Sequence, residues 1–195
     1  KQCVGGRKHG SAMTLSHLRI DAARLLARLD QLAQIGPIDG GGCCRLALTD
    51  EDKAGGDLVV GWRRELGLEV SIDRIGNVFG LRAGREALPP AMTGSHVDTV
   101  RTGGRYDGNL GVLAGLEVVA TLDAAGIVTR RPLVVAFFTN EEGARFTPDM
   151  LGSLVFVGGV PLDEGLAAVA IDGKVLGDEL RRIGYAGAAP LPAYR

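Results

Sequence analysis

Residues 93–111 read TGSHVDTVRTGGRYDGNLG and gather one imidazole and two carboxylates around a glycine-rich turn. These side chains belong to His96, Asp98 and Asp107. Residues 91–97 lead into the centre of the stretch and predict a strand, whereas residues 110–122 are apolar almost all round and predict a buried helix. The sequence therefore predicts a strand, a polar turn and a helix in succession.

His96 and Asp98 stand two residues apart, so on a strand their side chains point to the same side. A metal-bound imidazole needs its second ring nitrogen held by an acceptor, commonly a carboxylate. Asp98 can supply that acceptor directly or by shaping the loop. The plainer interpretation is a histidine at a strand end beside a capping aspartate. Asp107 also has two interpretations: it could cap the helix that starts near Gly108, or it could bridge two cations.

A second acidic segment, Asn140-Glu141-Glu142-Gly143, follows the apolar run 133–138. Such a run predicts a strand covered on both faces, and strands of this kind end at the crevice where α/β proteins bind ligands. Adjacent carboxylates project differently. One could therefore coordinate a metal ion while the other takes a proton from water and passes it to a leaving nitrogen. The plainer interpretation is a solvated acidic pair at a strand end.

Two other kinds of site are disfavoured. The glycine-rich turn 103–108 precedes a helix and could cradle a phosphate, but neither GxGxxG nor GxxxxGK[ST] is present. Ser95, His96 and Asp98 have the residue types of a catalytic triad. Chain neighbours cannot adopt triad geometry, however, and the chain has no GxSxG motif.

Elsewhere the chain alternates helical and strand patterns, which predicts an α/β fold with helices on both faces of a sheet. Helices are expected over 14–35, 49–66 and 172–183, and strands over 68–73, 77–82 and 91–97, the first two strands forming a hairpin. The arginine pairs 63–64 and 130–131 are expected on solvated faces.

Composition limits the classes of partner. The chain has 195 residues, 46% of them apolar and 23% charged, with a formal net charge of −1. Because positive and negative residues are interspersed, the sequence predicts neither a basic surface for nucleic acid nor a basic membrane-binding face. No run reaches the ~18 apolar residues of a membrane span. The three cysteines, Cys3, Cys43 and Cys44, form no spaced pair, so a reducing cytoplasm is expected rather than a secreted disulfide framework.

Taken together, the motifs resemble those of M20-type di-metal hydrolases, and more closely the hydantoinase/carbamoylase branch. That branch includes N-carbamoyl-L-amino-acid hydrolases, allantoate amidohydrolases and β-ureidopropionases. The motifs that carry the resemblance are GSHVDTV at 94–100, GGRYDG at 103–108, LGVLAGLE at 110–117, FTNEEGARF at 138–146, MLGS at 150–153 and LRRIGY at 180–185. The NEEGARF run favours this branch over M20 aminopeptidases and deacylases.

The resemblance implies a role for each candidate residue. His96 would bind one metal ion, Asp107 would bridge two ions, and Glu142 would bind a metal ion. Glu141 would be the general base, and Asp98 would support His96. The implied cofactors are two divalent ions, Zn with Mn, Co or Ni as substitutes. The implied reaction is hydrolysis of a linear carbamoyl or ureido C–N bond in a small molecule.

The resemblance also implies a three-layer zinc-peptidase-like catalytic domain, with a central mixed sheet flanked by helices. Relatives continue into a further metal-binding histidine, a lid domain that builds a homodimer, and a last histidine ligand. This chain has no histidine after His96. We therefore expect residues 13–195 to be the N-terminal portion of the catalytic domain, truncated before the lid. Residues 1–12 look unlike the rest of the chain, and we expect them to be a non-native or disordered tail. The alternative from a different class is a non-catalytic fragment that binds at most one metal ion weakly.

Overall fold

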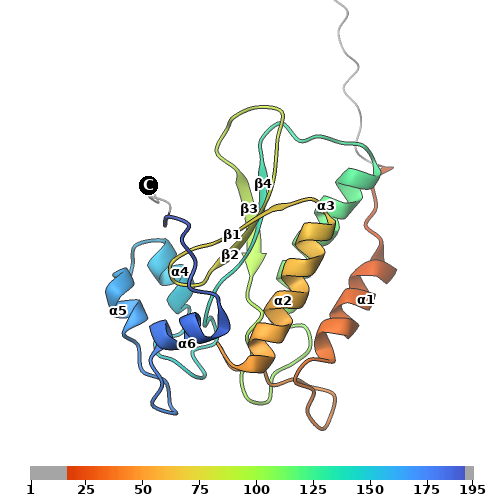
Figure 1. Cartoon of the computed structure of the whole chain (residues 1–195). Coiled ribbons are helices and arrows are strands. Elements are labelled where there is room, and N and C mark those ends of the chain that lie inside the picture. The colour runs from red at the N-terminus through yellow and green to blue at the C-terminus, as the bar shows by residue number, and fades with distance from the viewer. Residues whose placement is uncertain (1–16, 192–195) are drawn as a thin grey trace, which may run out of the picture.

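The computed structural model describes residues 17–191 and shows a four-stranded mixed sheet between two groups of helices (Figure 1). The predicted α/β architecture with helices flanking a mixed sheet is therefore confirmed. The expectation for residues 1–12, and the start of the helix expected from residue 14, lie outside the described residues. In the described part of the chain, no helix is long and apolar enough to cross a membrane.

The elements follow one another as the sequence patterns indicate, with two additional short helices, α4 and α5, after the fourth strand. In chain order they are α1 (Ala22–Ala33), α2 (Asp50–Glu65), β1 (Glu69–Ile72), β2 (Val78–Arg82), β3 (Ala91–Ser95), α3 (Asn109–Ala124), β4 (Leu133–Phe137), α4 (Leu151–Phe156), α5 (Leu162–Leu166) and α6 (Leu176–Ile183).

The strands lie in the order β1–β2–β4–β3. β1 and β2 form the predicted antiparallel hairpin, and Gly76 adopts a φ of 90° in its turn. β2 and β4 are antiparallel, whereas β3 and β4 are parallel, with Ser95 opposite Phe137. Four of the five β4 residues are buried, which confirms the prediction of a strand covered on both faces. Because β3 and β4 end at the same edge, the loops that follow them emerge side by side.

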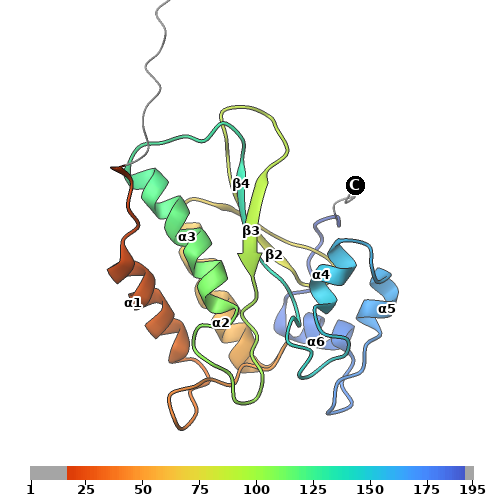
Figure 2. The same ribbon diagram turned by 180° about the vertical axis from the view of Figure 1, so that it is seen from behind.

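Helices α1 to α3 lie on one side of the sheet and α4 to α6 on the other (Figures 1 and 2). α3 packs on β3 and β4, and α1 packs on α3. Arg24 of α1 lies 2.7 Å from the buried carboxylate of Glu117 in α3, which joins these two helices. On the opposite face, the ring of Phe156 in α4 lies 5.5 Å from the ring of Phe79 in β2. The layers are thus joined by an ion pair on one side and by aromatic packing on the other.

Two helices are shorter than the sequence patterns predict. The first begins at Ala22, because the side chain of Asp21 caps its amino end. The last begins at Leu176, four residues later than expected, because a bridge between Val169 and Val175 closes the preceding residues into a turn. Local capping and bridging therefore decide these boundaries.

The prediction that the third helix is buried all round is wrong for its outer face. Leu110 and Val118 are 44% and 47% exposed, whereas Val112, Leu113 and Leu116 are fully buried. The helix rests on the sheet with one face only, so its apolar composition overstates its burial.

The expectation of a solvated arginine pair at 63–64 is wrong for Arg63, which is 0% exposed. Val59 and Val60 are buried on the same helix, and a residue three to four positions further on shares their face. Arg63 therefore points at the sheet, where its guanidinium lies 4.6 Å from the ring centroid of Phe137. Its Nη1 donates to the Val78 main-chain oxygen at 3.3 Å, but Nε and Nη2 have no hydrogen-bond partner.

Candidate metal centre

Three residues from two loops meet beyond the ends of β3 and β4: His96 and Asp107 lie in the loop 96–108, and Glu142 lies in the loop after β4. His96, Asp107 and Glu142 each offer one ligand atom, and these atoms all lie within 4.8 Å of one another. Among residues 17–191 this is the one group of three or more histidine, cysteine or acidic side chains with such a geometry. The parallel pairing of β3 and β4 brings the first and third of these residues together, and the glycine-rich turn returns Asp107 to them.

The orientation of the His96 ring is fixed on two sides. Gly108 lies against the ring, since a Cβ atom added at this glycine would stand 2.5 Å from it. Nδ1 of His96 lies 2.9 Å from the main-chain oxygen of Asp98. A carbonyl oxygen can only accept a hydrogen bond, so Nδ1 carries a proton, and in the neutral ring Nε2 carries the lone pair.

The lone pair of His96 faces acidic side chains. Nε2 lies 3.2 Å from Oε2 of Glu141 and 3.9 Å from Oδ1 of Asp107. A lone pair and carboxylate oxygens at these distances repel one another unless a positive charge lies between them. Imidazole nitrogen and carboxylate oxygen are also the ligand types of catalytic zinc sites. The residues present therefore fit a divalent cation.

Asp98 connects the two loops. Its carboxylate is 4% exposed and accepts hydrogen bonds from the main-chain N–H groups of Glu141 at 3.3 Å and Glu142 at 3.2 Å. The same carboxylate lies 3.8 Å from Nδ1 of His96, farther than the main-chain oxygen that accepts the ring proton. Burial raises the pKa of the Asp98 carboxyl, and the neighbouring His96 opposes this rise. Asp98 thus contacts the imidazole through its backbone and holds the glutamate loop through its side chain.

Negative charge accumulates where the ligand atoms meet. Burial raises the pKa of Glu142, and the nearby carboxylates of Asp107 and Glu141 raise it further. The side chains of Asp107 and Glu141 are 72% and 34% exposed, so one side of the site is open to solvent. A bound cation would relieve this repulsion, and the open side would admit a small molecule.

Asp107 does not have the capping role that was its alternative interpretation. The N-cap of α3 is Gly108, which adopts a φ of 66°, and no side chain caps this helix. A residue at this glycine with a side chain would be strained and would strike His96. Gly108 therefore belongs to the site, although the sequence marked it only as part of a glycine-rich turn.

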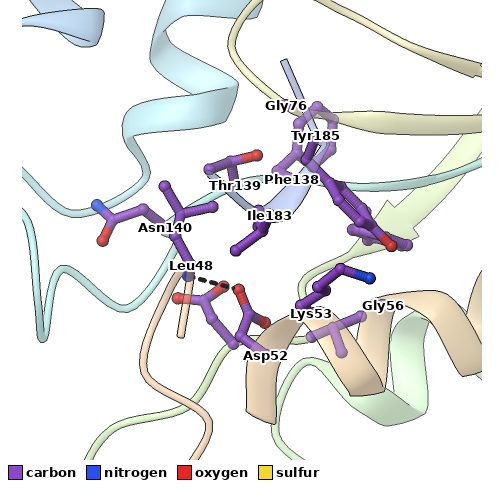
Figure 3. Close-up of a pocket in the computed structure, with 13 residues that line it drawn as sticks. Leu48, Asp52, Lys53, Gly56, Gly76, Phe138, Thr139, Asn140, Ile183 and Tyr185 are labelled. Atoms are coloured by element: carbon purple, nitrogen blue, oxygen red, sulfur yellow. Dashed lines mark hydrogen bonds between the residues drawn. The ribbon is translucent and has the colours of Figure 1, made fainter. Parts of the chain in front are cut away.

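A small cavity of about 20 Å³ has Asp98 among its lining residues, and Figure 3 shows the side chains around it. Asp52 faces it from the start of α2 and accepts a hydrogen bond from the Leu48 N–H at 2.7 Å. Burial and the charge of Asp98 raise the pKa of Asp52 to about 8. The sequence indicated only a helix-starting acid here, because the contact depends on packing between segments 46 residues apart.

Comparison with known proteins bears on this arrangement. Residues 92–183 match the profile of Peptidase family M20/M25/M40. The region that carries the candidate site belongs to the M20 family. The predicted family resemblance is thereby confirmed, and metal dependence is a property of this family that the His–Asp–Glu group fits.

Similarity to M20 relatives covers most of this chain but less than half of theirs. The N-carbamoyl-L-amino-acid amidohydrolase of Rhizobium meliloti is 48% identical over 171 residues, which are 87% of this chain and 41% of that protein. The ureidoglycolate hydrolase of Arabidopsis thaliana is 34% identical over 91% of this chain and 38% of its own length. A crystal structure of a hydantoinase/carbamoylase family amidase from Burkholderia ambifaria superposes with a TM-score of 0.89 at 51% identity, covering 91% and 44% of the two chains.

Proposed function

We propose that this chain is the N-terminal catalytic portion of a metal-dependent amidohydrolase that cleaves a linear carbamoyl or ureido C–N bond. The observation that carries the proposal is the meeting of His96, Asp107 and Glu142, with the imidazole lone pair directed at carboxylates. The 48% identity to a relative named N-carbamoyl-L-amino-acid amidohydrolase favours an N-carbamoyl amino acid as the substrate class. Allantoate or ureidoglycolate chemistry is the second candidate, because a ureidoglycolate hydrolase is 34% identical.

The proposed cofactors are two divalent cations, with Zn²⁺ as the first candidate and Mn²⁺, Co²⁺ or Ni²⁺ as substitutes. His96, Asp107 and Glu142 would supply ligands, and Asp107 would bridge the two ions. Bound cations at such a site polarise a carbonyl oxygen and lower the pKa of water. We further propose that the parent enzyme is a homodimer built through a lid domain.

Glu141 is the proposed general base. Its Oε2 lies beside the ligand group, at 3.2 Å from Nε2 of His96, and its side chain is partly open to solvent. At this place Oε2 can take a proton from water and deliver it to the leaving nitrogen, so that the amine departs protonated. Asp98 keeps this carboxylate in place, because it binds the N–H groups of Glu141 and Glu142.

The test combines metal content with substrate selectivity. The purified chain is stripped of metal and titrated with Zn²⁺, and the parent enzyme is assayed with an N-carbamoyl-L-amino acid, with ureidoglycolate and with a dipeptide. Retention of Zn²⁺ by the chain, about two ions per subunit in the parent enzyme and amine release from the carbamoyl compound support the proposal, with His96→Ala as the variant that loses metal. Cleavage of the dipeptide alone would instead favour an M20 aminopeptidase. Failure to retain Zn²⁺ would favour the non-catalytic fragment.

A further inference from the structure

Arg45 lies fully buried against the loop 96–108 between β3 and α3, which carries the proposed ligands His96 and Asp107. Its Nε donates to the main-chain oxygen of Val97 at 3.2 Å, one residue after His96. Its Nη2 donates at 3.1 Å to Oδ1 of Asn109, the first residue of α3 and two residues after Asp107. One rigid guanidinium therefore joins the two ends of this loop.

Each end of this link is tied further into its loop. The main-chain N–H of Arg45 donates to Oγ1 of Thr99 at 2.8 Å, and the Thr99 N–H donates to the Arg45 main-chain oxygen at 2.8 Å. Nδ2 of Asn109 donates to the Arg105 main-chain oxygen at 3.1 Å, and the Asn109 N–H donates to the Asp107 main-chain oxygen at 2.6 Å. A displacement of the guanidinium would thus be passed to both ends of the loop 96–108.

The fold leaves a slot for this side chain. Nη1 donates to the main-chain oxygens of Leu32 and Ile35 at the end of α1, at 3.2 and 3.1 Å. A Cβ atom at Gly55 would stand 3.0 Å from Cδ of Arg45, and one at Gly36 would stand 3.3 Å from Cγ. The four side-chain hydrogen bonds of Arg45 all go to neutral oxygens. The arrangement is therefore that of a geometric brace rather than of an ion pair.

We propose that Arg45 is a positioning residue that sets the separation of His96 and Asp107, near the two ends of the loop 96–108, and thereby the affinity of the site for a divalent cation. This inference rests on the proposed function, since it takes the two residues as metal ligands. A lysine ammonium is a single point on a flexible stem and cannot reach the Val97 and Asn109 oxygens with a planar fork. Replacement of Arg45 by lysine keeps the charge but removes the brace.

The experiment measures the Zn²⁺ affinity of the metal-free chain by competition with a chromophoric chelator. Arg45→Lys and Asn109→Ala are compared with the wild type, and Arg63→Met serves as the control for change at a buried arginine away from the site. We expect roughly 10–100-fold weaker Zn²⁺ binding for the first two variants, the range found when partners of metal ligands are removed. The control should bind Zn²⁺ with wild-type affinity. All measurements are made far below each melting temperature, so that a loss of stability alone does not change the affinity.

Wild-type Zn²⁺ affinity in a folded Arg45→Lys variant would overturn the inference and leave the proposed function standing. If Arg45→Lys does not fold, Asn109→Ala decides, because it removes one acceptor and leaves the other guanidinium contacts in place. Wild-type affinity in Asn109→Ala would then overturn the inference. If the wild-type chain itself binds no Zn²⁺, the proposed function fails first, and the inference fails with it.

Discussion

Nε2 of His96 lies 3.2 Å from Oε2 of Glu141, while the Nδ1 proton of the same ring is held by the main-chain oxygen of Asp98. The imidazole therefore turns its lone pair toward a carboxylate that belongs to the loop after β4. Such a contact suits a proton acceptor placed beside a cation. It also explains why two neighbouring glutamates can differ in role, since Glu142 belongs to the ligand group and Glu141 stands next to it.

Replacing Glu141 by alanine should separate catalysis from metal binding. We expect the Glu141→Ala variant of the active parent enzyme to lose about 10²–10⁴-fold in kcat, the usual contribution of a general base, with metal content close to that of the wild type. Steady-state kinetics and elemental analysis of the same preparation check both. If metal is lost together with activity, the roles of Glu141 and Glu142 are reversed.

Gly108→Ala tests whether the ring of His96 is held in place by the turn. The new Cβ would stand 2.5 Å from the ring at a φ of 66°, so the ring or the loop must move. We expect Zn²⁺ affinity to fall by at least an order of magnitude. Gly104→Ala is the matched control in the same turn, because nothing lies within 4 Å of its added Cβ. Equal Zn²⁺ affinities for the two variants would mean that the contact between Gly108 and His96 does not constrain the site.

Arg63→Met should stabilise the fold. Burial lowers the pKa of Arg63 to about 9, and two of its nitrogens lack partners. Methionine would fill a similar volume without a buried charge, which we expect to raise the free energy of unfolding by about 1–3 kcal/mol. The gain should hold at any pH below about 9, where Arg63 is charged in both states. Denaturant unfolding at neutral pH measures it.

The control for that variant is Arg145→Met, at a second buried arginine. Nη2 of Arg145 lies 2.9 Å from Asp172 and 2.7 Å from Glu179, so its removal takes one of two arginine partners from the buried Glu179 carboxylate, which keeps Arg182. We expect a loss of about 1–3 kcal/mol. If Arg63→Met is destabilising by a similar amount, then Arg63 has polar partners that its surroundings do not reveal.

Asp52 should make stability depend on pH. Burial and the Asp98 charge raise its folded-state pKa to about 8, above the unfolded value of about 3.9. The folded state therefore binds more protons than the unfolded state between these values. Stability from this group is complete below about pH 4 and is lost as the pH rises toward 8.

The variant Asp52→Asn keeps a neutral side chain at every pH. Relative to the wild type, it should gain unfolding free energy as the pH rises from about 4 to 8. Urea denaturation of both proteins in the presence of a chelator checks this. A constant difference between the two proteins across that range would show that Asp52 is ionised throughout, as in an ordinary exposed carboxyl.

The sequence predicted the sheet from local patterns, but it predicted the site only from motifs. The hairpin turn at Gly76 and the buried run of β4 are local patterns, and both were found as expected. The convergence of His96, Asp107 and Glu142 is predicted from motifs rather than from periodicity, since two loops must meet in space. The ligand roles of these residues remain predictions.

What the sequence did not reveal depends on packing between distant segments. Arg45 lies 52 residues before Val97 and 64 residues before Asn109, and no local pattern marks it as a brace between them. Arg63 was expected in solvent because arginine is usually solvated, but its place on the inner face of α2 determines its burial. Likewise, the composition of α3 could not show that Leu110 faces outward.

The central claim is that His96, Asp107 and Glu142 together hold a divalent cation. Anomalous X-ray diffraction at the zinc edge, from a crystal of the chain grown with Zn²⁺, tests it most directly. The account predicts anomalous peaks between these side chains, with Nε2 of His96 and a carboxylate oxygen of Glu142 each at about 2.0–2.2 Å from a peak and with the Asp107 carboxylate in contact with each peak. A peak elsewhere, with the space between these three side chains empty, would contradict it.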